Sequence, residues 1–290
     1  MRLFQKSVAT PGILENVQPA SWREHRFGLP KARWERLQGK DFWITGAGTG
    51  YGRCIALALA AAGSRVFISG RRIEKLRETV GEGAELGIDV RRCIAVPVDI
   101  KSEEDLTRAV RHIQLVTPSL YGLVNSAALP QPSETAFPLT GQSVAAWTDV
   151  LTTNVTGSWL TCKAAMPLLG NGEGFRVLFL SSFAGWASTP GFGPYNISKS
   201  AVNTLGASFA AECAMRYPEK DVQINVLVPG EARTEMNQGS MESPYAVVSM
   251  VLVLLSHPPG GPNGYFFNRD GQHLAFAYTP PYSQPLLSMH

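Results

Sequence analysis

Residues 41–52 of the chain read DFWITGAGTGYG, from Asp41 to Gly52. The first five residues are a largely apolar run that predicts a short buried strand, and a glycine-rich turn follows it directly. A helical stretch over residues 53–62 comes next and ends at Gly63, a residue type that commonly follows a helix C-terminus. Glycines allow close backbone approach, and the helix N-terminus offers unpaired N–H groups to a diphosphate. The order of strand, glycine turn and helix therefore predicts a nucleotide-binding site.

Strands and helices alternate along the rest of the chain. The predicted strands after the first cover residues 65–69, 94–98, 121–125, 176–181, 223–228 and 265–268. The predicted helices cover residues 73–80, 102–112, 145–169, 195–217 and 244–256. Nearly continuous apolar strands separated by helices are typical of a parallel sheet that is covered on both faces. We therefore expect an α/β fold, a doubly wound parallel sheet of about seven strands, with ligands at the carboxyl ends of the strands.

Tyr195 and Lys199 stand one helical turn apart, and Ser182 lies thirteen residues upstream of the tyrosine. Residues at i and i+4 share a helix face, so the lysine ammonium can lie close to the phenol. Free tyrosine has a pKa of about 10, which makes it a poor acid or base at neutral pH. A nearby cation favours the phenolate, so we expect Lys199 to lower the pKa of Tyr195.

Together these motifs resemble those of the short-chain dehydrogenase/reductases, in the single-domain branch whose first turn reads Thr-Gly-x-x-x-Gly-x-Gly. Thr45, Gly46, Gly50 and Gly52 match that turn. The resemblance covers about residues 40–275, and its motifs occur in family order. It implies a Rossmann-like fold and an NAD(P)-dependent oxidoreductase.

Further positions match the family in the same order. Asp99 stands where an acid that contacts adenine ends the third strand. Asn125 opens an Asn-Ser-Ala-Ala stretch that departs from the family's Asn-Asn-Ala-Gly at two of four positions. Asn154 matches the helix asparagine of the catalytic tetrad, and Pro229-Gly230 with Thr234 matches the segment beside the nicotinamide.

The resemblance also implies roles for the tetrad. Tyr195 would be the general acid/base, and Ser182 would hydrogen-bond the reacting oxygen of the substrate and stabilise its charge. Lys199 would hold the nicotinamide ribose in addition to acting on Tyr195. Asn154 would position a water between Lys199 and bulk solvent.

The end of the second strand indicates the choice of cofactor. Enzymes that prefer NAD place an acid there, whereas this chain has Gly70 followed by Arg71 and Arg72. Arginine suits a 2′-phosphate, so we predict NADP(H) in preference to NAD(H), with Arg71 as its reader. The alternative is that both arginines only begin a solvated helix. The residues predicted to bind the cofactor are Thr45, Gly46, Gly50, Tyr51, Gly52, Arg71, Asp99, Ile100, Asn125, Tyr195, Lys199, Pro229, Gly230 and Thr234.

Composition sets the remaining expectations. The chain has 290 residues and a formal net charge of +3 without a basic run, which argues against nucleic-acid and membrane partners. Its four cysteines are isolated in the sequence, so we expect free thiols, no metal site and a cytoplasmic location. We expect an N-terminal extension over residues 1–39, one catalytic domain over residues 40–275, and a tail over residues 276–290.

Assembly and substrate are predicted less directly. The 244–256 helix is apolar on most of its circumference, so a second subunit is expected to cover its outer side in a homodimer or homotetramer. The short stretch 231–243 leaves little chain for a lid, so the site is expected to be either open or covered by another segment, around a bulky small-molecule substrate. Candidates for its rim are aromatic residues of the extension (Trp22, Phe27, Trp34) and of the tail (Phe276, Tyr278, Tyr282). Phe183, Trp186 and Phe192 could line the substrate cleft, or they could be core packing. The predicted function is a ketone reductase or alcohol dehydrogenase. The alternative is a non-catalytic NADP-binding sensor or scaffold, which would not need the intact tetrad.

Overall fold

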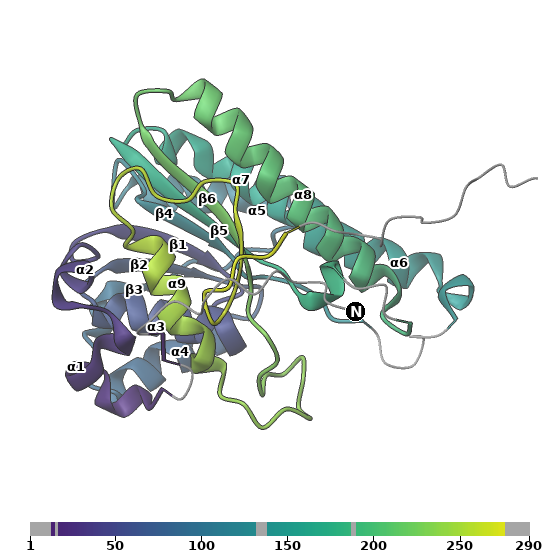
Figure 1. Cartoon of the computed structure of the whole chain (residues 1–290), viewed down its shortest axis with the longest axis horizontal. Helices are drawn as coiled ribbons and strands as arrows, with labels where there is room; N and C mark the ends of the chain where they lie inside the picture. Colours follow the sequence, from purple (N-terminus) through teal and green to yellow (C-terminus); the bar gives the residue numbers. More distant parts are fainter. Residues whose placement is uncertain (1–12, 15–16, 132–137, 187–189, 276–290) are drawn as a thin grey trace, which may run out of the picture.

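In the computed structural model, which describes residues 13–14, 17–131, 138–186 and 190–275, seven parallel strands form one sheet (Figure 1). Their order is β3-β2-β1-β4-β5-β6-β7. The strands are β1 (Asp41–Thr45), β2 (Arg65–Ser69), β3 (Cys93–Ala95), β4 (Gly122–Asn125), β5 (Gly174–Leu180), β6 (Asp221–Val228) and β7 (Phe266–Asn268). The predicted doubly wound parallel sheet is confirmed. β3 is shorter than predicted, although the extended residues Val96 and Val98 still donate hydrogen bonds to the carbonyls of Ile68 and Gly70.

Helices cover both faces of the sheet (Figure 1). One face carries α3, α4 and α9, and the other carries α5, α7 and α8. Their bounds are α3 (Gly50–Ala61), α4 (Ile73–Glu85), α5 (Glu103–Gln114), α6 (Val144–Leu151), α7 (Gly157–Leu169), α8 (Gly193–Arg216) and α9 (Val248–Leu255).

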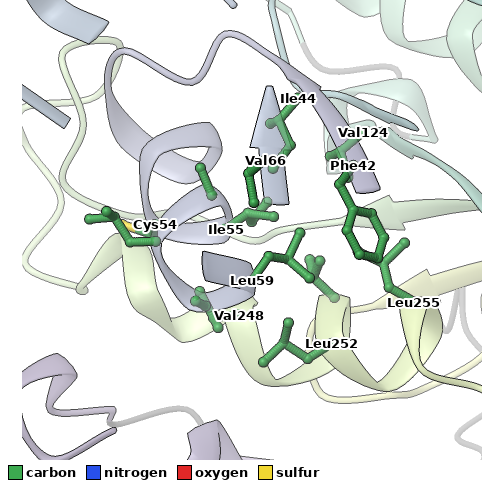
Figure 2. Close-up of a cluster of buried hydrophobic side chains, with 14 of the residues drawn as sticks. Phe42, Ile44, Cys54, Ile55, Leu59, Val66, Val124, Val248, Leu252 and Leu255 are labelled. Carbon is green, nitrogen blue, oxygen red and sulfur yellow. The ribbon is translucent and has the colours of Figure 1, made fainter. Parts of the chain in front are cut away.

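Alternating side chains of the strands fill two separate cores. Phe42 and Ile44 of β1 pack toward α3 and α9, whereas Trp43 between them packs toward α5 and α7. Figure 2 shows the first of these cores, in which Ile55 and Leu59 of α3 lie among side chains of the sheet and of α9. Because both faces of β1 are buried, its apolar residues form a continuous run, as in other parallel sheets.

Two predicted helices are interrupted in the structure. The 145–169 stretch consists of α6, a π-helical turn at Thr152–Thr156 and α7, so the segment that contains Asn154 is wound more loosely than an α-helix. The 244–256 stretch opens with a 3₁₀ turn at Pro244–Val247, and α9 follows it. Neither change of winding leaves a periodicity signal distinct from that of an α-helix.

The N-terminal segment packs against α9. It contains two short helices, α1 (Trp22–His25) and α2 (Lys31–Glu35), and it buries Phe27 and Leu29 in the core that α9 shares with α3. Arg33 donates hydrogen bonds to the Val253 carbonyl and the Ser256 hydroxyl at the end of α9. The side of α9 that we expected a second subunit to cover is therefore covered by this chain itself.

Replacing Phe27 tests this packing. Phe27 is 1% exposed, and its ring stacks on Tyr245 at a centroid distance of 6.2 Å. We expect Phe27→Ala to lower the free energy of unfolding by about 3–5 kcal/mol, because it leaves a cavity under the segment. Urea unfolding measures the change. Phe192→Ala is the control, since that ring is 41% exposed and its loss should change stability by less than about 1 kcal/mol. Equal effects of the two changes would contradict the packing.

Candidate active site

The glycine turn approaches the end of β4 too closely for a side chain. A Cβ atom added to Gly46 would lie 2.7 Å from the Cα of Ala127, and one added to Gly52 would lie 2.3 Å from the Gly46 carbonyl oxygen. Gly46 also has a φ of +67°, which favours glycine. These contacts explain the glycines at positions 46 and 52 by packing of backbone on backbone.

Thr45 holds the chain that leaves β4. Its buried hydroxyl accepts hydrogen bonds from the backbone N–H groups of Ser126 and Ala127, at 3.2 and 3.3 Å. It also lies 3.5 Å from the Val124 carbonyl, to which it can donate. Thr45 thus does not line the cavity but holds the chain after β4, which does.

A cavity runs along the carboxyl ends of β1, β2 and β4. Seven of the residues predicted to bind the cofactor line it: Gly46, Gly50, Tyr51, Arg71, Asp99, Ile100 and Thr234. Tyr51 also joins the turn to the segment after β6, because its hydroxyl donates to the Gly230 carbonyl at 2.9 Å. The structure therefore brings residues from four separate motifs to one cavity.

The other predicted cofactor residues do not line this cavity. Asn125 turns its side chain toward α7, where its amide nitrogen lies 3.3 Å from the Cys162 sulfur, so it faces the core below the site. Pro229 and Gly230 follow β6 at the edge of the site, and Gly230 takes part through its carbonyl alone. Tyr195 and Lys199 stand on α8, outside the residues that line the cavity.

Ser182, Tyr195 and Lys199 meet where β5 ends and α8 begins. The Ser182 hydroxyl accepts from the Ala184 N–H at 3.2 Å, and Ser182 lies close enough to the Tyr195 phenol to lower its pKa. The Lys199 ammonium lies 5.6 Å from the centroid of the Tyr195 ring and donates to the Leu180 carbonyl at 2.9 Å. The predicted serine, tyrosine and lysine are thus together in space.

The pKa of Tyr195 shifts in the direction opposite to our expectation. Tyr195 is half-buried, and the protein packed around its phenol raises the pKa above the ordinary value, while the nearby Ser182 opposes the shift. Burial also lowers the pKa of Lys199 to about 8. The sequence argument was wrong on this point because it weighed the lysine charge and left out burial, which disfavours the charged form of both groups.

Asn154 is fully engaged with the protein. Its amide oxygen accepts from the Leu129 N–H at 2.7 Å, and its amide nitrogen donates to the Leu129 carbonyl and the Ser198 hydroxyl, both at 3.0 Å. Ser198 donates in turn to the Tyr195 carbonyl at 2.7 Å. Asn154 therefore ties the chain after β4 to the helix that carries Tyr195. The predicted role of Asn154 in positioning a water between Lys199 and bulk solvent stays a prediction.

Basic side chains gather at the start of α4. Arg71 lines the cavity and makes no hydrogen bond or ion pair with the residues that the structure describes. Arg72 pairs with Glu235 at 2.6 Å, and Lys75 lies 3.7 Å from the same carboxylate. The two neighbouring arginines therefore differ: Arg71 has no partner among the described residues, whereas Arg72 is paired with Glu235.

Three polar residues of the cavity were missed. Lys75 follows Arg72 by three positions, a spacing that puts both on one helix face and could have been noticed. Thr153 lines the cavity, and its buried hydroxyl has no hydrogen-bond partner within the described part of the chain. Glu235 lies beside Thr234, and no local pattern marks it.

The aromatic residues considered as neighbours of the substrate lie in different environments. Phe183 and Phe192 are 39% and 41% exposed, so they are available at the surface near Tyr195. Trp186 is buried and packs on Phe266 at 5.6 Å. Trp22, Phe27 and Trp34 stack on one another and on Tyr245, not at the rim of the cavity. The tail lies outside the described residues.

Several known proteins have sequences similar to that of this chain. The family model of short chain dehydrogenases matches residues 40–244. The chain is 30% identical over 229 residues to dehydrogenase/reductase SDR family member 4 of Rattus norvegicus, covering 78% of each chain. It is 28% identical to the 3-oxoacyl-[acyl-carrier-protein] reductase FabG of Aquifex aeolicus, over 76% of this chain and 92% of that one.

Solved structures of similar fold include complexes with NADP. A short chain dehydrogenase of Shigella flexneri complexed with NADP matches with a TM-score of 0.73 and 25% identity, over 81% of this chain and 99% of that one. One from Escherichia coli complexed with NADPH matches with a TM-score of 0.73 and 26% identity, over 83% and 99%. The chain belongs to the short-chain dehydrogenase/reductase family, a family of NAD(P)-dependent oxidoreductases. Among the described helices, none is both long and apolar enough to cross a bilayer.

The pKa of Lys199 predicts a pH-dependent stability. A pKa near 8 in the folded chain, against an ordinary value of 10.5, means that the unfolded state binds more protons between these pH values. The free energy of unfolding should therefore rise with pH in this window. Lys199→Met should be more stable than wild type at pH 7, by roughly 1–3 kcal/mol, and lose this advantage as the pH approaches 10.

Urea unfolding between pH 7 and 10 measures the difference between the two proteins. Lys163→Met serves as the control, because the Lys163 side chain is 53% exposed and pairs with Glu103 at the surface. A stability difference for Lys199→Met that stays constant with pH would refute the lowered pKa.

Proposed function

We propose that the chain is an NADP-dependent oxidoreductase that interconverts a carbonyl group and an alcohol, with Tyr195 as general acid/base. The observation that carries this proposal is the placement of Lys199 at 5.6 Å from the centroid of the Tyr195 ring, at the carboxyl end of the sheet, where Ser182 follows β5. A sensor or scaffold would need the nucleotide cavity alone, so this arrangement favours an enzyme over the alternative function.

The residues of the cavity fit the dinucleotide. The glycine turn opens α3, so backbone N–H groups of the helix N-terminus are available to a diphosphate. The buried Thr153 hydroxyl has no partner within the described chain and points to a polar ligand. Arg71 would meet a 2′-phosphate, and Asp99 would meet the adenosine part. Two of the similar solved structures contain NADP or NADPH, which supports the same cofactor here.

The proposed chemistry of reduction divides between two bonds. The nicotinamide, when bound, supplies the hydride that the carbonyl carbon accepts. Tyr195 gives its phenolic proton to the carbonyl oxygen, so that the O–H bond of the alcohol forms as that of the phenol breaks. Ser182 donates a hydrogen bond to the same oxygen and stabilises its developing negative charge. Lys199 would hold the nicotinamide ribose.

The protonation state of Tyr195 at neutral pH is the one that reduction requires. Because burial raises the pKa of Tyr195, its phenol keeps its proton at pH 7 and is ready to act as an acid. Alcohol oxidation needs the phenolate as a base and should therefore require a higher pH.

The remaining features of the proposal follow the sequence. We infer a cytoplasmic enzyme with an N-terminal extension (1–39), a catalytic domain (40–275) and a tail (276–290), acting on a bulky or extended substrate. Exposed Phe183 and Phe192 beside the catalytic group support an apolar substrate surface. A homodimer or homotetramer stays a prediction, and its interface must use a surface other than the covered side of α9.

Replacing Tyr195 tests the catalytic assignment. We expect Tyr195→Phe to lower kcat/KM by about 100-fold or more, because the proton donor is lost, and to change NADPH affinity by less than about twofold. NADPH absorbance with a panel of ketones and aldehydes measures turnover. Tyr217→Phe, at the far end of α8, is the matched control and should retain activity. Substantial turnover by Tyr195→Phe would defeat the assignment.

Replacing Arg71 tests the choice of cofactor. A charge-assisted contact is worth roughly 1.5–3 kcal/mol, so Arg71→Ala should weaken NADPH binding about tenfold or more and leave NADH binding nearly unchanged. Isothermal titration with each dinucleotide gives both values. Arg77→Ala removes an exposed charge elsewhere on α4 and controls for the general field. Equal losses for the two dinucleotides would show that Arg71 does not read the phosphate.

A further inference from the structure

One carboxylate occupies the basic end of the cavity. Glu235 lies 2.6 Å from the Arg72 guanidinium and 3.7 Å from the Lys75 ammonium, which is itself hydrogen-bonded to Glu78 at 2.9 Å. Glu235, Arg72 and Lys75 line the cavity together with Arg71. Arg72 and Lys75 follow β2, whereas Glu235 follows β6, so these contacts join segments that leave the sheet on either side of β1, β4 and β5.

The turn that carries Glu235 is well defined. Thr234 and Asn237 exchange backbone hydrogen bonds, both at 3.2 Å, and the Asn237 N–H also binds the Thr234 hydroxyl at 3.1 Å. The methyl group of Thr234 lies against the glycine turn, within 3.1 Å of the position that a Cβ on Gly50 would take. Glu235 is therefore presented to the two cations by a closed turn that also borders the glycine turn.

The chemistry of this contact is that of a phosphate site. A guanidinium that binds one anion with an ammonium beside it is a combination of groups that binds phosphate in proteins, and here Arg72 is hydrogen-bonded to Glu235 while Lys75 is hydrogen-bonded to Glu78. The hydrogen bond from Arg72 holds the pKa of Glu235 below its ordinary value, so the carboxylate is charged at neutral pH. A 2′-phosphate carries a charge of about −1.5 to −2 and three acceptor oxygens, so it would compete for the Arg72 guanidinium.

We propose that Glu235 is a specificity-determining residue, whose carboxylate competes with the 2′-phosphate of NADP(H) for Arg72. The inference rests on the proposed function, since it assumes that the cavity takes a nicotinamide dinucleotide. NAD(H) has no phosphate at this position and leaves the ion pair intact. Glu235 thus weakens the preference for NADP(H) that Arg71 would otherwise create.

The exposure of the pair makes this exchange feasible. The side chains of Arg72 and Glu235 are 53% and 47% exposed, and an exposed ion pair shifts an equilibrium by only about two- to fivefold. A charge-assisted contact to phosphate changes affinity by about tenfold or more. The phosphate should therefore displace the carboxylate. The affinity for NADP(H) is then lower by the factor that breaking the ion pair costs.

The test is Glu235→Gln, which keeps the shape of the side chain and removes its charge. We expect NADPH to bind about two- to fivefold more tightly to this variant than to wild type, and NADH to bind within about twofold of wild type. Isothermal titration measures both, and 2′,5′-ADP against 5′-AMP isolates the phosphate end without nicotinamide. Glu74→Gln is the matched control, because this exposed carboxylate lies two residues from Arg72 and forms no ion pair within the described chain.

The results separate the inference from the proposed function. If wild type binds NADPH but Glu235→Gln binds NADPH and 2′,5′-ADP no more tightly, the competition is refuted while the proposed function stands. An equal gain in NADPH affinity with Glu74→Gln also refutes the competition, because the gain would then come from the loss of any nearby negative charge. If wild type binds neither dinucleotide, both proposals fall. Adding Arg72→Gln to Glu235→Gln should abolish the gain, and a gain that persists would also count against the competition.

Discussion

The position of β1 between β2 and β4 is the constraint on which the site depends. The chain leaves β1 toward α3 on one face, while the chain leaving β4 crosses the same edge of the sheet, so two backbones must pass each other. They pass so closely that a Cβ on Gly46 would lie 2.7 Å from Ala127, and the Thr45 hydroxyl binds the N–H groups on the other side of the contact. The cavity begins where these backbones separate, as expected at the point where strand order reverses.

The glycine turn is also braced from outside the sheet. Arg53 donates to the Gly48 carbonyl at 3.0 Å and pairs with Glu82 of α4 at 3.3 Å. Glu82 accepts the hydroxyl of Tyr245 at 2.9 Å, and the Tyr245 ring stacks on Phe27. A continuous series of contacts thus runs from the N-terminal segment to the turn. The segment lies outside the range that the family model matches, yet it packs in the same core as α9 and contacts the support of the turn. Truncation of this segment should therefore affect the turn as well as α9.

The sequence predicted what is local. The strand, the glycine turn and the start of α3 follow one another directly, so their geometry is determined by a few neighbouring residues. The orientation of Asn125 was not predictable, because the last residue of a buried strand can face either core, and here it faces Cys162. The contact of Glu235 with Arg72 joins positions 163 residues apart, and no periodicity encodes such a pair. Local sequence patterns identified the residues of the glycine turn. The contacts between segments far apart in the sequence, such as Glu235 with Arg72, became visible only in the structure.

The catalytic group shows the same limit in its electrostatics. The sequence spacing correctly predicted that Lys199 lies beside Tyr195, but the surrounding protein determines the pKa values of both groups. Both groups lie under protein that disfavours their charged forms, so the phenol holds its proton while the ammonium has a pKa near 8 and gives its hydrogen bond to the Leu180 carbonyl. Because the pKa of Lys199 lies near 8, one added hydrogen bond or one neighbouring charge can change the protonation state of this lysine. Spacing therefore identifies the pair, whereas the surrounding protein sets the direction of both pKa shifts.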